Sequence, residues 1–220
     1  MRRLLLALIF LGTGCHAGAA PEDPFDRAMQ DAAQGRHAAA AAGFHALALQ
    51  GEPAAAHNLS ILFALGQGVP RNTAEAAYWA LRALLDGLEQ AAPLADLLLA
   101  DLPVAERARL ADRLEAGLSP AAADGDAGAM LGLAVVLALI RPEPDLLTAH
   151  AWQSIAAALD RPGALQAREV TLSRMTPEDR VRAQAHALDA FAAWCASQVP
   201  PGLASCGVIT PGVQSGNAQR

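Results

Sequence analysis

Residues that could perform chemistry are few in this chain of 220 residues, and no established catalytic motif brings them together. The histidines are His16, His37, His45, His57, His150 and His186. None of them lies in an H-E-x-x-H sequence, and C-x-x-C and G-x-S-x-G are also absent, so the usual zinc, redox and serine-hydrolase motifs are missing. All 16 basic residues are arginines, which excludes mechanisms that need a lysine. We therefore expect no catalytic residue, no bound metal and no cofactor.

The weaker chemical signals have simpler explanations. Gly66-Gln67-Gly68 begins like a dinucleotide-binding loop, but Arg71 stands where the third glycine belongs, and no strand is expected before it. His57 and His150 lie in expected helices, where a hydrogen-bonded, partly buried histidine is more common than a metal ligand. The net charge of −6 argues against nucleic acid as a partner.

The composition indicates the elements that must position these residues. Alanine and leucine occupy 54 and 33 positions, whereas aromatic residues make up only 4% of the chain. Alanine and leucine favour helices, and the residues that favour strands are sparse. The sequence therefore predicts an all-α protein of about ten helices joined by short loops.

Capping residues indicate where several helices begin and end. Gly51 with Pro53 ends one helix and starts the next. Asn72 and Glu75 form a capping-box pattern, and Thr176-Pro177 is a second helix start, followed by acidic residues. Ser119-Pro120 resembles another start, and Pro93 suits the first turn of its helix. After Thr176, the apolar residues that recur at helical spacing are Val181, Ala185, Leu188, Ala192 and Cys195.

The chain also contains an internal repeat. One constant shift of the sequence along itself places Gly51 on Gly125, Pro70 on Pro144 and Pro103 on Pro177. A shift that is one position shorter places Trp79 on Trp152. Two modules of about 70 residues follow from this self-similarity. The expected organisation is a signal peptide at 1–19, a helical lead at 20–50, modules at 51–118 and 119–197, and a Pro/Gly-rich tail at 198–220.

The N-terminus and the cysteines indicate an exported protein. A basic start, eight apolar residues and Ala17-Gly18-Ala19 match a signal peptide that is cleaved near Ala19. The alternative is an outer-membrane lipoprotein with a lipid anchor at Cys15. No later stretch is long and apolar enough to predict a membrane span. Cys195 and Cys206 remain as an even pair, which is expected to form a disulfide, or to stay as two free thiols.

The first module contains a characteristic series of small and large apolar residues: Ala55, Leu59, Phe63, Gly66, Gly68, Val69, Ala76, Trp79, Ala83 and Gly87. With these residues it resembles a Sel1-like repeat, a relative of the tetratricopeptide repeat. The second module keeps Ala129, Leu133, Ala149, Trp152 and Ala156, but Arg141-Pro142-Glu143-Pro144 replaces the glycine loop. The resemblance covers residues 51–87 well and residues 125–195 more distantly.

This resemblance implies an α-solenoid of antiparallel helix pairs and a non-catalytic role. Trp79 and Trp152 are expected to pack between helices, because helix pairs of this kind bury their apolar faces by stacking. The implied function is a scaffold for protein–protein interaction in the cell envelope, periplasmic or secreted, with Tyr78, Arg82 and Glu75 as candidate partner-binding residues. Alternatively, Tyr78 and Arg82 only stack on each other at the surface.

Two other functions remain open at this stage. Some exported relatives with regularly spaced cysteines suggest a binder or slow hydrolase of peptidoglycan-like or β-lactam ligands, although this chain lacks their cysteine pairs. The tail at 199–220 could instead be a functional peptide carried by a structural domain.

Overall fold

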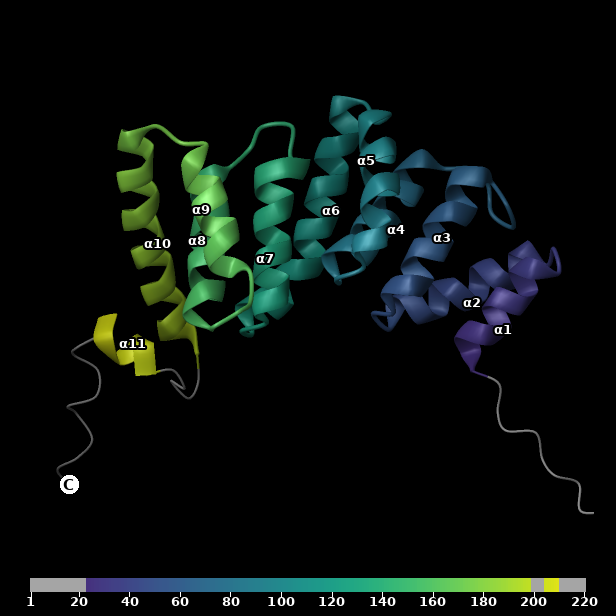
Figure 1. Ribbon diagram of the computed structural model, residues 1–220, viewed down its shortest axis with the longest axis horizontal. Coiled ribbons are helices and arrows are strands. Elements are labelled where there is room, and N and C mark those ends of the chain that lie inside the picture. The colour runs from purple at the N-terminus through teal and green to yellow at the C-terminus, as the bar shows by residue number, and fades with distance from the viewer. Residues whose placement is uncertain (1–22, 199–203, 210–220) are drawn as a thin grey trace, which may run out of the picture.

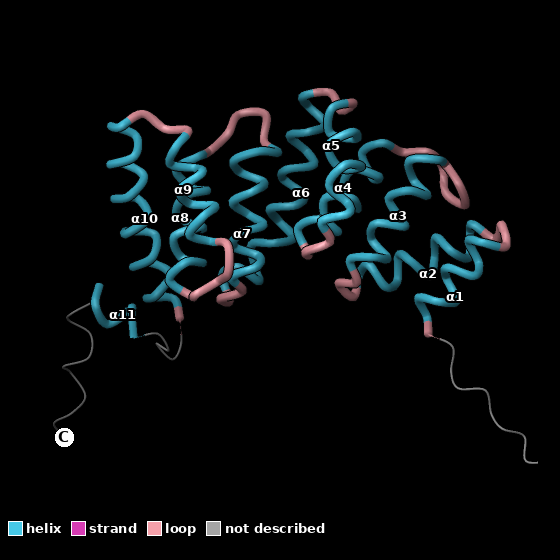
Figure 2. Tube along the Cα trace, viewed as in Figure 1, coloured by secondary structure: helices cyan, strands magenta, loops and turns pink. Residues whose placement is uncertain are grey.

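The computed structural model describes residues 23–198 and 204–209, and within these ranges every regular element is a helix (Figures 1 and 2). The helices are α1 (Pro24–Ala33), α2 (His37–Leu49), α3 (Pro53–Leu65), α4 (Thr73–Leu85), α5 (Ala92–Ala100), α6 (Val104–Ala123), α7 (Ala127–Val135), α8 (Leu146–Ala158), α9 (Ala164–Ser173), α10 (Pro177–Ser197) and α11 (Ala204–Ile209). A 3-10 turn, Glu89–Ala91, precedes α5, and a π-helical turn, Val136–Ile140, extends α7. The prediction of an all-α protein is confirmed.

The helices pack in the order in which they occur, which gives the elongated row seen in Figure 1. Helices α1 to α4 each pack on the next one, and α4 also contacts both α5 and α6. The row continues from α6 to α7 and α8, and α8 contacts both α9 and α10. Helices α7 to α10 therefore repeat the order of contacts made by α3 to α6.

The bounds of the helices follow the same period. Helices α4 and α8 both have 13 residues. The starts of α4 and α8 are separated by the same number of residues as the starts of α6 and α10. The starts of α3 and α7 are one residue further apart. The boundaries between modules stay a prediction, but this constant offset makes each residue of α8 equivalent to one of α4, and each residue of α10 except the last equivalent to one of α6.

Small residues let the helices approach closely, as the repeat pattern predicts. Ala55, Leu59, Ala76, Ala83, Leu133 and Ala149 are buried, as is Trp79, while Phe63 and Trp152 are half-buried against the same clusters. Gly66 and Gly68 turn the chain between α3 and α4 with positive φ angles of 70° and 72°, a conformation that glycine adopts without strain.

Most of the expected helix ends are present. The Asn72 side chain accepts hydrogen bonds from the backbone N–H groups of Ala74 and Glu75, and Thr176 accepts one from Asp179. Pro93 lies in the first turn of α5. These caps satisfy backbone donors that a helix start leaves open.

The helix start expected at Ser119-Pro120 is wrong. Pro120 lies inside α6, which continues to Ala123. Leu114, Leu118 and Ala122 are buried on one side of this helix through the proline, and their packing offsets the hydrogen bond that proline cannot donate. The exposed position of Pro120 keeps its ring away from the core.

Of the apolar residues that recur at helical spacing in the last long helix, only Cys195 is buried. Val181 and Leu188 are 67% and 54% exposed. The buried face of α10 consists of Ala183, Ala187, Phe191, Trp194 and Cys195. Two aromatic rings bury more apolar area than a valine and a leucine, so they decide how the helix is rotated.

The C-terminal end of the described chain is tied down covalently. Cys195 of α10 and Cys206 of α11 form a disulfide. The expected signal peptide, the Cys15 anchor and most of the tail lie outside the described residues. Within the described ranges, no helix combines the length and apolar character that crossing a membrane requires.

Candidate functional site

The three predicted partner-binding residues lie together on α4, next to an arginine of α6. A Glu75 carboxylate oxygen is 2.6 Å from Arg113 Nη1. The Arg113 guanidinium also lies 3.5 Å from the centre of the Tyr78 ring, a cation–π contact. The side chains of Arg113 and Glu75 remain 46% and 32% exposed, so a partner could reach this cluster.

Arg82 continues the cluster one turn further along α4. Its Nη2 is 3.4 Å from the Asp86 carboxylate. Burial alone would lower the pKa of Arg82, but Asp86 and a hydrogen bond with Tyr78 raise it, and the pKa lies above its ordinary value. Arg82 also lines a hollow of about 430 Å³ with Arg161 and Asp126.

The cation over Tyr78 is therefore Arg113, which the sequence did not single out. Arg113 lies on another helix, distant in the chain, and no local pattern links it to Tyr78. The two interpretations of Tyr78 and Arg82 from the sequence, partner binding and stacking on each other, both consider α4 alone. We define Glu75, Tyr78, Arg82 and Arg113 as the α4–α6 cluster.

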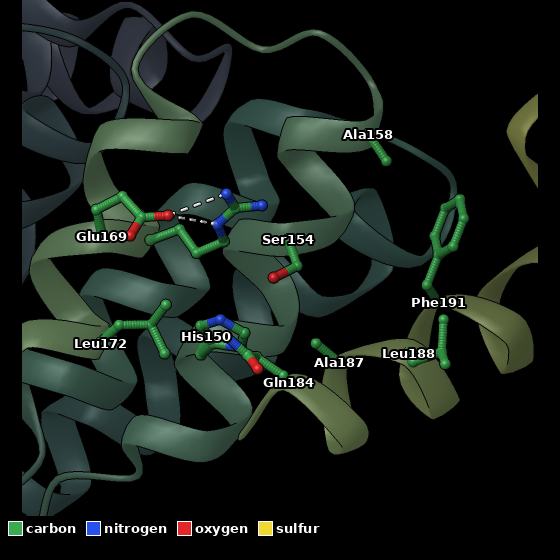
Figure 3. A pocket seen from close by; sticks show the side chains of 10 residues that line it. His150, Ser154, Ala158, Glu169, Leu172, Gln184, Ala187, Leu188 and Phe191 are labelled. Atoms are coloured by element: carbon green, nitrogen blue, oxygen red, sulfur yellow. Dashed lines mark hydrogen bonds and ion pairs between the residues drawn. The ribbon is translucent and has the colours of Figure 1, made fainter. Parts of the chain in front are cut away.

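A second hollow, of about 380 Å³, lies over α8 between α9 and α10 (Figure 3). We call it the α8 groove. Helix α8 contributes His150 and Ser154, and α10 contributes Gln184 and Phe191 on the opposite side. From α9, Arg168 Nε and Nη2 both donate to Glu169 Oε1, at 3.2 and 3.0 Å.

His150 is buried more deeply than the partly buried histidine that the sequence predicted. Its side chain is 2% exposed, and its Nδ1 has no hydrogen-bond partner among the described residues. Burial lowers the pKa of His150, as do Arg168 and His186, against opposing contributions from the Ala183 backbone and Glu169. The imidazole is therefore neutral near pH 7.

His57 lies in α3 and is half-buried, and burial lowers its pKa as well. Among the described residues, no three histidine, cysteine or acidic side chains lie close enough together to hold a metal ion.

Comparison with known proteins adds one structural likeness. No protein-family model and no curated protein matches the chain. The fold is similar to the crystal structure of c5321, a protective antigen of uropathogenic Escherichia coli that displays an SLR (Sel1-like repeat) fold. The match covers 90% of this chain with 19% identity and a TM-score of 0.30. The chain spans about a third of that protein, since 34% of its length is covered.

The class of the protein is defined by its own helices: it is an all-α protein whose helices pack in sequential pairs.

Proposed function

We propose that this chain is an exported, non-catalytic scaffold that binds a protein partner in the cell envelope. The observation that carries the proposal is the α4–α6 cluster, where tyrosine and arginine side chains gather on a partly exposed surface. Tyrosine and arginine are enriched among the residues that dominate binding energy at protein interfaces.

The physical state of the cluster suits binding. The cation–π contact between Arg113 and Tyr78 favours one arrangement of the two side chains before a partner arrives. Side chains that are already ordered lose less conformational entropy on binding. Arg82 extends the surface towards the neighbouring hollow, so a partner can contact the cluster over more than one helical turn.

The proposed compartment rests on different evidence. The disulfide between Cys195 and Cys206 is consistent with an oxidising compartment. The N-terminal residues 1–19 have the sequence pattern of a signal peptide. A periplasmic or secreted location accommodates both observations, and a lipoprotein anchored at Cys15 remains the alternative.

A cross-linking pull-down from envelope extracts tests the proposal. Purified mature protein should retrieve one or two specific proteins, and Tyr78→Ala or Arg82→Ala should weaken their recovery without lowering the melting temperature enough to unfold the bait. Arg109→Ala is a matched control, because this arginine lies on α6 with a largely exposed side chain outside the cluster.

Two results would contradict the scaffold. If the pull-down recovers only abundant, non-specifically bound proteins, and in equal amounts for all variants, there is no evidence for a specific partner. A rise in melting temperature with muropeptides or β-lactams, together with that result, would favour the ligand-binding alternative.

A further inference from the structure

A third hollow, of about 360 Å³, lies between α8 and α10, and none of the residues of the α8 groove lines it. Trp152 and Ile155 of α8 and Trp194 of α10 form its walls. Small side chains, among them Ala151 and Ala190, leave the space between these walls open. We call it the Trp152 hollow.

The Trp152 hollow is the place in the second repeat, α7 to α10, that the α4–α6 cluster occupies in the first repeat, α3 to α6. When α8 is aligned with α4 and α10 with α6, each of the four cluster residues has an equivalent that lines the hollow. The equivalent pairs are Glu75 and Thr148, Tyr78 and Ala151, Arg82 and Ile155, and Arg113 and His186. The same position in the repeat is thus filled by large side chains in one half and left open in the other.

An aromatic ring of the chain itself fills this place in the first repeat. The Tyr78 ring meets the Trp79 ring edge-on, with ring centres 5.0 Å apart and an angle of 79° between the planes. The Arg113 guanidinium covers Tyr78 at 3.5 Å from the ring centre. Trp79 is consequently only 4% exposed.

The second repeat keeps the tryptophan but has lost the ring beside it. Trp152 is the equivalent of Trp79, and Ala151 stands in the place of Tyr78. Trp152 is therefore only half-buried, and it shares the wall of the hollow with Trp194. Aromatic surface that is open to water gains free energy when it is covered, and more so when a second ring covers it edge-on or offset.

This sequence has no exposed aromatic ring to place in the hollow. Residues 199–203 and 210–220 contain no phenylalanine, tyrosine or tryptophan. Among the described residues, every aromatic side chain is at least half-buried, so a second copy of the chain offers no exposed ring from this part either. Phe10 lies in the expected signal peptide. A ring that fills the hollow therefore comes from a different protein.

The lining also indicates that the incoming side chain is uncharged. None of the described residues that line the hollow is an arginine, an aspartate or a glutamate. A charged side chain would lose its hydration there without gaining an ion pair. The α4–α6 cluster, in contrast, presents Glu75, Arg82 and Arg113 to a partner.

We propose that the Trp152 hollow docks the phenylalanine or tyrosine side chain of a segment of the partner protein, whose ring takes the place that Tyr78 takes in the first repeat. The proposal rests on the scaffold function and specifies the chemistry of its partner. Equivalent positions of stacked repeats lie along one face of a solenoid. One partner segment can thus contact the charged α4–α6 cluster and insert its ring into the hollow.

Nuclear magnetic resonance titration of the ¹⁵N-labelled mature protein tests the proposal with Ac-Ala-Phe-Ala-NH2 and Ac-Ala-Leu-Ala-NH2. The phenylalanine peptide should shift the indole N–H resonances of Trp152 and Trp194, because both rings line the hollow. The indole resonance of Trp79 should stay unchanged, because Tyr78 already fills the equivalent place. The phenylalanine peptide should bind about three- to tenfold more tightly than the leucine peptide, as expected for an aromatic contact.

Three variants test the equivalence of the two repeats. Ala151→Tyr introduces the residue of the first repeat, so its ring should fill the hollow and abolish binding of the phenylalanine peptide. Tyr78→Ala should open the equivalent place, so that the Trp79 indole resonance now responds to the peptide. Ala185→Tyr adds the same ring at an exposed position of α10 outside the hollow, and it should leave the affinity unchanged.

The titration of the unmodified protein does not depend on the folding of any variant. Equal affinities for the two peptides, or shifts that spare both Trp152 and Trp194, would overturn the proposal. In the pull-down, Ala151→Tyr should weaken recovery of the same partner as Tyr78→Ala does. Unchanged recovery with Ala151→Tyr, together with weaker recovery with Tyr78→Ala, would overturn the docking of a ring and leave the scaffold function intact. Failure to recover any specific partner would contradict the scaffold function itself, so the two failures are distinguishable.

Discussion

The turn between α3 and α4 offers a sharp test of the fold, because Gly68 lies directly against the start of α2. A Cβ atom built on Gly68 would lie 2.2 Å from the backbone C and O atoms of His37 and 2.5 Å from the nitrogen of Ala38. Gly68 also has a φ of 72°. Gly68→Ala therefore combines backbone strain with a collision between two backbone segments.

The two contributions can be estimated separately. A left-handed backbone costs a non-glycine residue about 1–2 kcal/mol. Inserting a methyl group into a closely packed contact typically costs about 1–3 kcal/mol more. Gly51→Ala is the matched control, since its φ is 87° but its Cβ would meet nothing within 4 Å. We expect Gly51→Ala to lower the free energy of unfolding by the first amount only.

Urea denaturation followed by circular dichroism measures both variants. Gly68→Ala should be less stable than Gly51→Ala by about 1–3 kcal/mol. If the two variants lose equal stability, the turn does not lie against α2 as described. If Gly51→Ala loses as much unfolding free energy as the total expected for Gly68→Ala, the cost of a positive φ angle for alanine is larger than estimated.

The remaining predictions concern packing, capping, the disulfide and pH. Trp79→Ala should lower the free energy of unfolding by about 3–5 kcal/mol, because the ring is buried between helix pairs. Asn72→Ala should cost about 0.5–2 kcal/mol through loss of the α4 cap. Replacing Cys195 and Cys206 by serine should cost about 2–3 kcal/mol. All three are measured by urea denaturation. Burial lowers the pKa of His150 below 6.5, so the unfolded chain binds a proton that the folded chain does not. Stability should fall as the pH drops through 6.5, and thermal melts should show a weaker fall in His150→Gln.

Control experiments distinguish these specific losses of stability from non-specific destabilisation by mutation. Leu49→Ala, at an exposed position of α2, should change stability by less than about 0.5 kcal/mol. Alkylation of the unreduced protein should label no cysteine of the 195–206 pair. Labelling at both cysteines would contradict the disulfide, and a pH response identical in His150→Gln and the unmodified protein would contradict the role of His150.

Sequence reasoning predicted the helices well because their signals are local. The caps at Asn72 and Thr176 act within three residues of the helix start, and alanine and leucine favour helix at every position they occupy. The sequence also indicated the repeat, because a helix pair that recurs along the chain carries its glycines, prolines and tryptophans with it.

Features that depend on a second helix were predicted poorly. The periodicity of α10 was consistent with more than one buried face, and the contact of its two aromatic rings with the rest of the protein selected one. Trp194 Nε1, for example, donates to the carbonyl of Ala123, 71 residues away. Pro120 looked like a helix start because the burial of Leu118 and Ala122 cannot be read from neighbouring residues.

The candidate sites divide in the same way. The sequence by itself determined that Glu75, Tyr78 and Arg82 share one helix, since a spacing of three or four residues places side chains on one face. Only the tertiary structure decided that Arg113 covers Tyr78 and that His150, Arg168 and Phe191 meet in one groove. The physical reason is that a helix is determined by bonds between near neighbours in the chain. The rotation and spacing of packed helices are determined by contacts between distant ones.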